Sequence, residues 1–492
     1  MPVRRVFAVA FVGFFLLAAA WALALPTNGT YDEHQHLVRG YAVWSGQFYP
    51  QGRGVDDAGT PAEVVDAPRS LLPENVNCMW RPKPPKPASC QLPVTDRTNG
   101  PMPTTAGLYS PVYYLAVGLP LRLSPDSTGL VFARLLSAAT SALLLAAAAA
   151  VAARRGNKLL FAALVLVSTP LAMNLNGSIN PNGLEISAGV LLFTALLAAL
   201  RSPARPLLIL AGVAAALLLT VRSLGPALFA FVVLACVLFA GRGPALALLR
   251  RRDTLMWFGG LSAAGVAFCA FWLLSSRVTD VVPDRGLELG IGAILKGIAT
   301  TRGEFYLRQI VGQFSYGETP VSPVMILLWY VLMAALVVPA IWLASWRARL
   351  AICGIAVVSA LLLIGLEIHF VPLRGWYAQG RYVMPLAVGV VIAAAYVDGI
   401  AAWLTRRGWL DLVALALVVI TVPLDLYALA RVMTRFQVGI NAGLQPFGGS
   451  WQPASGPVLP LLACLVGGLL LTSTVLVRAV RPAAEPEKVS VG

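Results

Sequence analysis

The chain has 492 residues, of which 58% are hydrophobic and only 12% charged, and its mean hydropathy is +0.76. A soluble protein of this size needs far more charge to cover its surface, so the composition excludes that class. The formal net charge of +15 lies in short Lys and Arg clusters between apolar blocks. This distribution argues against nucleic-acid binding and suits contact with anionic membrane lipids.

The apolar blocks have the length of transmembrane helices, because about 20 helical residues are needed to cross a bilayer. The first block follows Arg4 and Arg5 and has some features of a signal peptide, but its apolar core is longer than usual, which favours a retained helix. We therefore predict an all-α polytopic membrane protein. About twelve spans are expected, near residues 6–25, 128–152, 159–175, 184–200, 206–221, 224–241, 254–275, 321–345, 350–368, 381–403, 409–429 and 458–478.

Basic residues between the spans predict the orientation, because cytoplasmic loops are enriched in Lys and Arg. We expect a bacterial inner (plasma) membrane protein with both termini in the cytoplasm. Residues 1–480 form the transmembrane domain, and residues 481–492 form a disordered cytoplasmic tail. The stretch 110–123 is too short to span comfortably and contains Pro120, so it is expected as an interfacial helix. The main extracytoplasmic segments are expected at 27–109, 276–320 and 431–457.

Cys78 and Cys90 fall in the first extracytoplasmic segment, whereas the other four cysteines fall within spans. Two cysteines in a Pro-rich loop on the oxidising side of a membrane predict a disulfide. Their surroundings contain no His or Cys set with the spacing of a zinc site.

The most informative motif is Tyr31–His36, directly after the first span. Its adjacent carboxylates, Asp32 and Glu33, suit a general base, or ligands for a divalent cation or a magnesium phosphate. The alternative is that Asp32 only caps a helix that begins at Glu33. A zinc pair formed by His34 and His36 is the weaker interpretation, because their spacing separates them on a helix.

A second motif, Ser178–Glu185, occupies the turn between two spans. Asn182 and its neighbours can cap the following helix, and Glu185 then lies at the mouth of the membrane, where an unpaired carboxylate is costly. Arg222 lies in another short turn on the same side. These residues either bind a ligand or pair with one another for packing alone.

A third motif contains Arg374, Gln379, Arg381 and Tyr382. Arginines beside aromatic residues suit a phosphate and a sugar ring, although an aromatic belt at the membrane interface would give a similar pattern. All these motifs lie on the same expected side of the membrane. We therefore predict that several loops build one extracytoplasmic cavity.

With these motifs in order, and with Ser110–Tyr114 and Phe314–Thr319, the chain resembles a bacterial family of predicted membrane proteins of unassigned function. That family is related to the GT-C superfamily of polyprenyl-phosphate-sugar glycosyltransferases. The resemblance covers nearly the whole chain, and the step from Gln379 to Tyr382 into a span is its most telling part. It implies a GT-C-like bundle. The long, Pro-rich first extracytoplasmic loop is a feature of this sequence that departs from the family pattern.

The resemblance also implies an inverting transfer of a sugar from a polyprenyl-phosphate donor to a cell-envelope glycan or lipid acceptor. Asp32 or Glu33 would be the catalytic carboxylate. No cofactor is certain, and the sequence leaves a divalent cation open. A transporter or flippase, or a non-catalytic protein that binds lipid-linked sugars, is the alternative. The residues expected to bind substrate are His36, Asn182, Glu185, Arg222, Arg374, Gln379, Arg381 and Tyr382.

Overall fold

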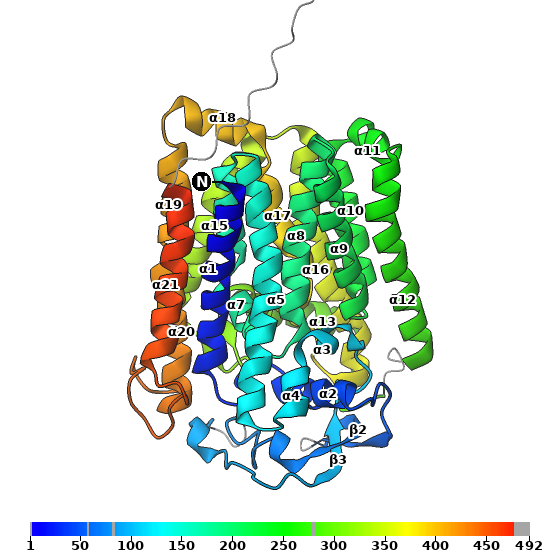
Figure 1. The fold of residues 1–492 in the computed structure, drawn as a ribbon, viewed down its shortest axis with the longest axis vertical. Coiled ribbons are helices and arrows are strands. Elements are labelled where there is room, and N and C mark those ends of the chain that lie inside the picture. The colour runs from blue at the N-terminus through cyan, green and yellow to red at the C-terminus, as the bar shows by residue number, and fades with distance from the viewer. Residues whose placement is uncertain (1, 57–58, 81–83, 277–281, 477–492) are drawn as a thin grey trace, which may run out of the picture.

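The computed structural model describes residues 2–56, 59–80, 84–276 and 282–476. Long helices form one bundle, and a small β-sheet lies beyond one end of it, which we call the sheet end (Figure 1). In this part of the chain, eight helical stretches are long and apolar enough to span a membrane. They are Val3–Ala24 (α1), Ser127–Arg154 (α5), Pro181–Arg201 (α8), Thr254–Ser276 (a π-helical turn, Thr254–Gly259, and α12, Gly260–Ser276), Pro323–Leu343 (α15), Trp346–Arg374 (α16), Leu410–Gln437 (α19, Leu410–Val419, and α20, Thr421–Gln437) and Val458–Leu476 (α21).

Three further spans are bent, which raises the number of spans among the described residues to as many as eleven. The shorter apolar helix Arg205–Val221 (α9) matches the remaining expected segment. The protein is thus a polytopic helical membrane protein. The bent pairs are Lys158–Val167 (α6) with Pro170–Asn176 (α7), at 72°; Gly225–Ala240 (α10) with Arg242–Leu249 (α11), at 118°; and Gly380–Ala395 (a 3-10 turn, Gly380–Val383, and α17, Met384–Ala395) with Asp398–Arg406 (α18), at 44°.

The break between α6 and α7 bends the span expected at 159–175. Pro170 has no amide hydrogen to continue the helix and disfavours helical geometry in the residue before it. That residue, Thr169, instead caps α7 by accepting a hydrogen bond from the amide of Ala172 at 3.3 Å. The turn after α7 contacts the start of the helix that begins at Glu33, whose Oε1 accepts a 3.2 Å hydrogen bond from the amide of Ile179.

Packing places α8 at the centre of the bundle, where its most apolar window is completely buried. Helix α1 packs closely against α21 through small residues, as in many membrane bundles. A Cβ atom on Gly13 would lie 2.9 Å from the side chain of Leu471, and one on Gly467 would lie 2.8 Å from the carbonyl oxygen of Gly13. The peripheral helices α12, α15 and α16 leave most of their apolar surface outside the protein.

The sheet end contains the expected loop 27–109, whose described residues form a helix, three strands and two 3-10 turns. Its helix Glu33–Trp44 (α2) packs against an antiparallel sheet. The strand order is β1-β2-β3, formed by Gly52–Val55, Pro61–Pro68 and Asn99–Thr104. The sheet was not predicted. The 3-10 turns are Arg69–Leu71 and Ala88–Cys90, and a disulfide joins Cys78 to Cys90.

The expected interfacial helix at 110–123 is two short helices, Pro111–Val117 (α3) and Leu119–Leu123 (α4), joined at Gly118. A side chain at Gly118 would meet the carbonyl oxygen of Gly40 at 2.6 Å, so the turn packs directly on α2.

The expected segment 276–320 contains further short elements. They are Ile291–Gly297 (α13), the π-helical turn Ile298–Arg302, Gly303–Val311 (α14), Gln313–Phe314 (β4) and Thr319–Pro320 (β5). Helix α20 continues to Gln437, so the loop expected from residue 431 begins later. Buried Arg435 explains this extension, because it donates hydrogen bonds from α20 to the carbonyl oxygens of Met79 at 2.6 Å and Lys86 at 2.8 Å. The tail expected at 481–492 lies outside the described residues.

Candidate functional site

A cavity of about 680 Å³ lies at the sheet end, between the bundle and the sheet. Its wall combines α2, strands β1 and β2, the segment before α3, the turn after α9, and the end of α16 with the loop that follows it. Residues far apart in the sequence therefore meet in one place. The sequence-predicted residues in this wall are Asp32, His36, Arg222, Arg374, Gln379 and Tyr382.

Asp32 has an unusual backbone conformation, with φ 57° and ψ 11°, in the left-handed region that few residues other than glycine adopt. Its side chain makes no capping hydrogen bond to α2, so the alternative of a simple helix cap is not realised. Instead its Oδ2 accepts a hydrogen bond of 2.7 Å from Nη2 of Arg381, while 39% of the side chain stays exposed. Strained residues of this kind cluster at functional sites.

Arg381 lies behind the wall rather than in it and is only 1% exposed. Its guanidinium carbon lies 4.1 Å from the centre of the Tyr31 ring, whose hydroxyl accepts a 2.7 Å hydrogen bond from Nε2 of Gln309. Within the described residues, Nε and Nη1 of Arg381 have no hydrogen-bond partner. Arg381 is thus a buried cation held by an aromatic face and directed at Asp32.

Glu33 does not line the cavity, although it is adjacent to Asp32 and was expected to share its role. Its fully buried carboxylate accepts hydrogen bonds from Nε of Arg134 at 2.7 Å and from Nη2 at 2.5 Å. The amides of Asn28 and Ile179 also donate to it, at 3.1 Å and 3.2 Å. These contacts assign Glu33 to the attachment of α2 to the bundle.

Asn182 and Glu185 lie behind the cavity and hold Arg222, which does line it. Oε2 of Glu185 accepts from Nδ2 of Asn182 at 3.1 Å and from Nη1 of Arg222 at 3.3 Å. The Arg222 guanidinium also lies over the rings of Tyr382 at 4.9 Å and Tyr109 at 5.8 Å. The sequence left open whether Glu185 and Arg222 pair with each other, and in the structure they do. The pair holds the Arg222 guanidinium beside aromatic rings.

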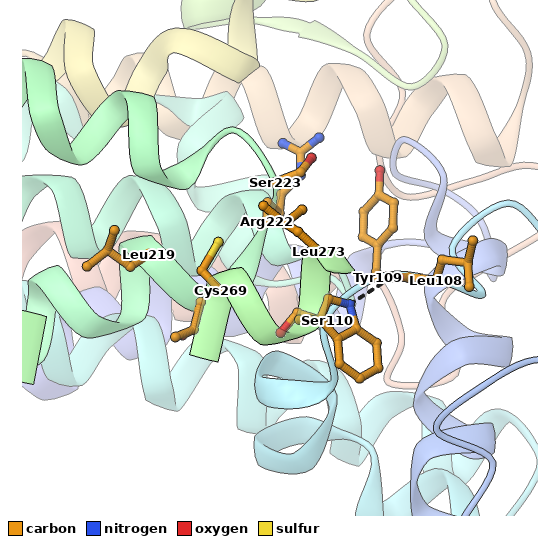
Figure 2. A pocket seen from close by; sticks show the side chains of 10 residues that line it. Leu108, Tyr109, Ser110, Leu219, Arg222, Ser223, Cys269 and Leu273 are labelled. Atoms are coloured by element: carbon orange, nitrogen blue, oxygen red, sulfur yellow. Dashed lines mark hydrogen bonds between the residues drawn. The ribbon is translucent and has the colours of Figure 1, made fainter. Parts of the chain in front are cut away.

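A small side pocket of about 30 Å³ shares Arg222 and Tyr109 with the cavity (Figure 2). Trp272 of α12 also lines it, and its Nε1 donates a 3.0 Å hydrogen bond to the carbonyl oxygen of Leu108. A space of this size holds about one water molecule. Of these two spaces, only the large cavity has room for a ligand bigger than a water molecule.

Arg374 ends α16 and differs from the other two cations in its partners. Its Nε donates to the carbonyl oxygen of Val282 at 3.3 Å, and among the described residues no carboxylate forms an ion pair with it. The loop that follows Arg374 is anchored by buried Glu367, which accepts a hydrogen bond from the amide of Tyr377 at 2.9 Å. Gln379 is braced by Gln309, whose Nε2 donates to it at 3.4 Å.

His36 lines the cavity, and its Nδ1 lies 2.7 Å from the hydroxyl of Tyr114. Burial lowers the pKa of His36 well below its usual value, and the nearby charges of Arg222 and Arg381 lower it further. The imidazole is therefore neutral near pH 7. Among the described residues, no group of three or more His, Cys, Asp or Glu side chains could hold a metal ion.

Sequence reasoning missed several residues that shape this site. Arg134 stands alone in an apolar span, which marks it as a candidate because isolated charges in membrane helices usually have a partner. Tyr31 and Gln309 gave no comparable signal, since their roles depend on contacts between distant segments.

The sequence profile of a family described as "Predicted membrane protein (DUF2142)" matches residues 15–390, and the chain belongs to this family. No curated protein matches the sequence. Among solved structures, the chain is similar to that of ArnT from Cupriavidus metallidurans bound to undecaprenyl phosphate. The match has 15% sequence identity and a TM-score of 0.39, and it covers 96% of this chain and 76% of the other.

Proposed function

We propose that this member of the DUF2142 family is a glycosyltransferase that transfers a sugar from a polyprenyl phosphate to a cell-envelope glycan or lipid acceptor. The observation that carries this proposal is the position of Asp32. An exposed carboxylate, oriented by buried Arg381, lies in the wall of a cavity that also contains Arg222, Arg374 and several aromatic rings. A base, cations for a phosphate and surfaces for a sugar are the groups that such a transfer needs.

The reaction follows from these positions. Asp32 takes the proton of an acceptor hydroxyl, and the oxygen attacks the anomeric carbon of the donor sugar. The bond from that carbon to the phosphate oxygen breaks on the opposite face, so the configuration inverts and the polyprenyl phosphate leaves. Arg374 is the best candidate to bind this phosphate, because Arg222 and Arg381 already neutralise Glu185 and Asp32.

The location of the cavity supports a lipid-linked donor. It lies where the helices end, so a phosphate can reach it at the level of the membrane head groups while the polyprenyl chain stays in the bilayer. We place this end on the extracytoplasmic side, because the basic clusters lie at the opposite end and the Cys78–Cys90 disulfide suits an oxidising compartment. In this orientation both termini lie in the cytoplasm, and the protein is located in the plasma membrane.

The test is turnover of an undecaprenyl-phosphate-linked sugar by the full-length protein in lipid nanodiscs, with a cell-envelope glycan fraction as acceptor. Replacing Asp32 with Asn should lower transfer at least about 1000-fold and leave undecaprenyl phosphate binding in place. Asp96→Asn, an exposed carboxylate at the sheet end, is the matched control and should keep full activity. Donor that binds but is never consumed, whatever residue stands at position 32, would instead indicate a transporter or a non-catalytic binding protein.

A further inference from the structure

A carboxylate stands on the inward face of the sheet, where apolar residues are usual. Side chains two positions apart in a strand share a face, and Val65 and Ala67 of β2 are 0% and 1% exposed in the core. Glu63 therefore belongs to the same inward face, and its side chain lines the cavity. A charged residue here costs stability unless it has a partner, so its presence calls for one.

The surrounding backbone fixes Glu63 in this position. It is paired in register with Thr104 of β3, whose buried hydroxyl donates a 2.8 Å hydrogen bond to the carbonyl oxygen of Gln35 on α2. The next turn closes on it so tightly that a Cβ atom on Gly107 would lie 2.5 Å from Cβ of Glu63. Sheet and helix thus hold the carboxylate at the cavity.

The protein partner of Glu63 is weak. Nε of Arg53, on the neighbouring strand, lies 3.7 Å from Oε1 of Glu63, and the Arg53 side chain is 65% exposed. Exposed ion pairs of this geometry contribute little to stability. The carboxylate therefore remains available to a ligand that can donate hydrogen bonds.

The two sides of the cavity differ in charge. The bundle side contributes Arg222 and Arg374, which suit an anionic phosphate. The sheet side contributes Glu63 together with the mostly exposed Arg53, so its less exposed charge is the carboxylate. The sheet itself lies beyond the ends of the membrane helices (Figure 1). We propose that the sheet side is the acceptor subsite, and that Glu63 binds the hydroxyl or ammonium groups of a carbohydrate that enters from the aqueous phase. The assignment of this subsite to the acceptor rests on the proposed function, whereas the binding of a carbohydrate beside Glu63 does not.

The experiment measures the Kd of three free sugars for the full-length protein in nanodiscs by ligand-observed NMR. The probes are glucosamine, glucose and glucuronate, which differ in charge. We expect glucosamine to bind most tightly and glucuronate least. Glu63→Gln should weaken glucosamine binding about tenfold, because a charged hydrogen bond is lost. Asp66→Asn is the matched control, because it removes a carboxylate from the outer face of the same strand, and it should leave binding unchanged.

A second measurement separates a ligand contact from a structural role. The Kd of undecaprenyl phosphate should stay within about threefold of the wild-type value in Glu63→Gln. An equal loss of sugar and undecaprenyl phosphate binding, or a Glu63→Gln protein that binds glucosamine like the wild type, would overturn the subsite. Octyl glucoside dissolved in the nanodisc tests the route of entry, since tighter binding than glucose by more than about tenfold would contradict entry from water. Sugar binding without any turnover would leave this site standing and would reject the proposed transfer instead.

Discussion

Nη2 of Arg381 donates a 2.7 Å hydrogen bond to Oδ2 of Asp32, although 349 residues separate them in the chain. The contact joins the segment after α1 to the turn that precedes α17. It therefore forms only when these two distant parts of the chain have packed together. The arginine is buried and the carboxylate is partly exposed. This asymmetry suits an arrangement in which the cation orients a carboxylate that acts on something in the cavity.

Replacing Arg381 with Lys should lower transfer about 100-fold, because a lysine ammonium keeps the charge but cannot hold the planar geometry between Tyr31 and Asp32. The measurement is the initial rate of sugar transfer in nanodiscs, with the Kd of undecaprenyl phosphate determined in parallel. Arg69→Lys, at an exposed position of the sheet end and outside the cavity wall, is the control and should transfer normally. A loss of undecaprenyl phosphate binding as large as the loss of rate would show that Arg381 holds the phosphate and does not orient Asp32.

Glu33→Gln should destabilise the fold, because it leaves the buried Arg134 guanidinium without its counter-charge. Removing one partner of a buried ion pair costs about 3–5 kcal/mol. The free energy of unfolding in a denaturing-detergent titration measures this effect. Asp32→Asn in the same assay should cost less than Glu33→Gln, because the side chain at position 32 is 39% exposed and the Arg381 guanidinium still lies against the Tyr31 ring. Equal losses for the two neighbours would contradict the separate roles assigned to them.

Acidification should weaken the fold through His36. Its pKa is lowered in the folded protein, so below about pH 6.5 the unfolded chain takes up a proton that the folded chain does not. Stability is then lost as pH falls from about 6.5, by at most about 1.4 kcal/mol per pH unit for this one group. Thermal unfolding between pH 7.5 and 5.5 should show this slope reduced in His36→Gln. The control His369→Gln changes another cavity histidine, and an equal reduction there would contradict the assignment.

The spans could be predicted because their signal is local. A bilayer requires an unbroken apolar block, and each expected block coincides with a helix or a bent helix pair. The sheet could not be predicted in the same way. Strand β3 contains Pro101 and Pro103, which are rare in strands, and its fit to β2 depends on a partner more than 30 residues away.

The candidate site was predictable only as far as topology allowed. Loops on one side of a membrane can meet, which is why Asp32, Arg222 and Arg374 were expected together and do line one cavity. Asp32 and Glu33 are adjacent in the sequence, and no local pattern could assign different roles to them. Their roles diverge because Glu33 meets Arg134, 101 residues further along the chain, in the interior of the bundle. Such a pairing is set by packing, which no local pattern contains.

Arg374 and Arg222 line the same cavity but should respond differently to substitution. Arg374→Gln should weaken undecaprenyl phosphate binding at least about tenfold with little loss of stability, because no carboxylate of the described structure pairs with it. Arg222→Gln should lower both, since it leaves Glu185 charged, buried and unpaired at a cost of about 3 kcal/mol.

The double variant Arg222→Gln with Glu185→Gln separates these effects, because it removes both charges of the pair together. Stability should recover in the double variant, and any deficit in undecaprenyl phosphate binding that persists then belongs to Arg222 itself. If Arg374→Gln binds undecaprenyl phosphate like the wild type while the double variant does not, the phosphate lies against Arg222 and Tyr109 instead. The donor would then approach the cavity from the side of the small pocket next to α12.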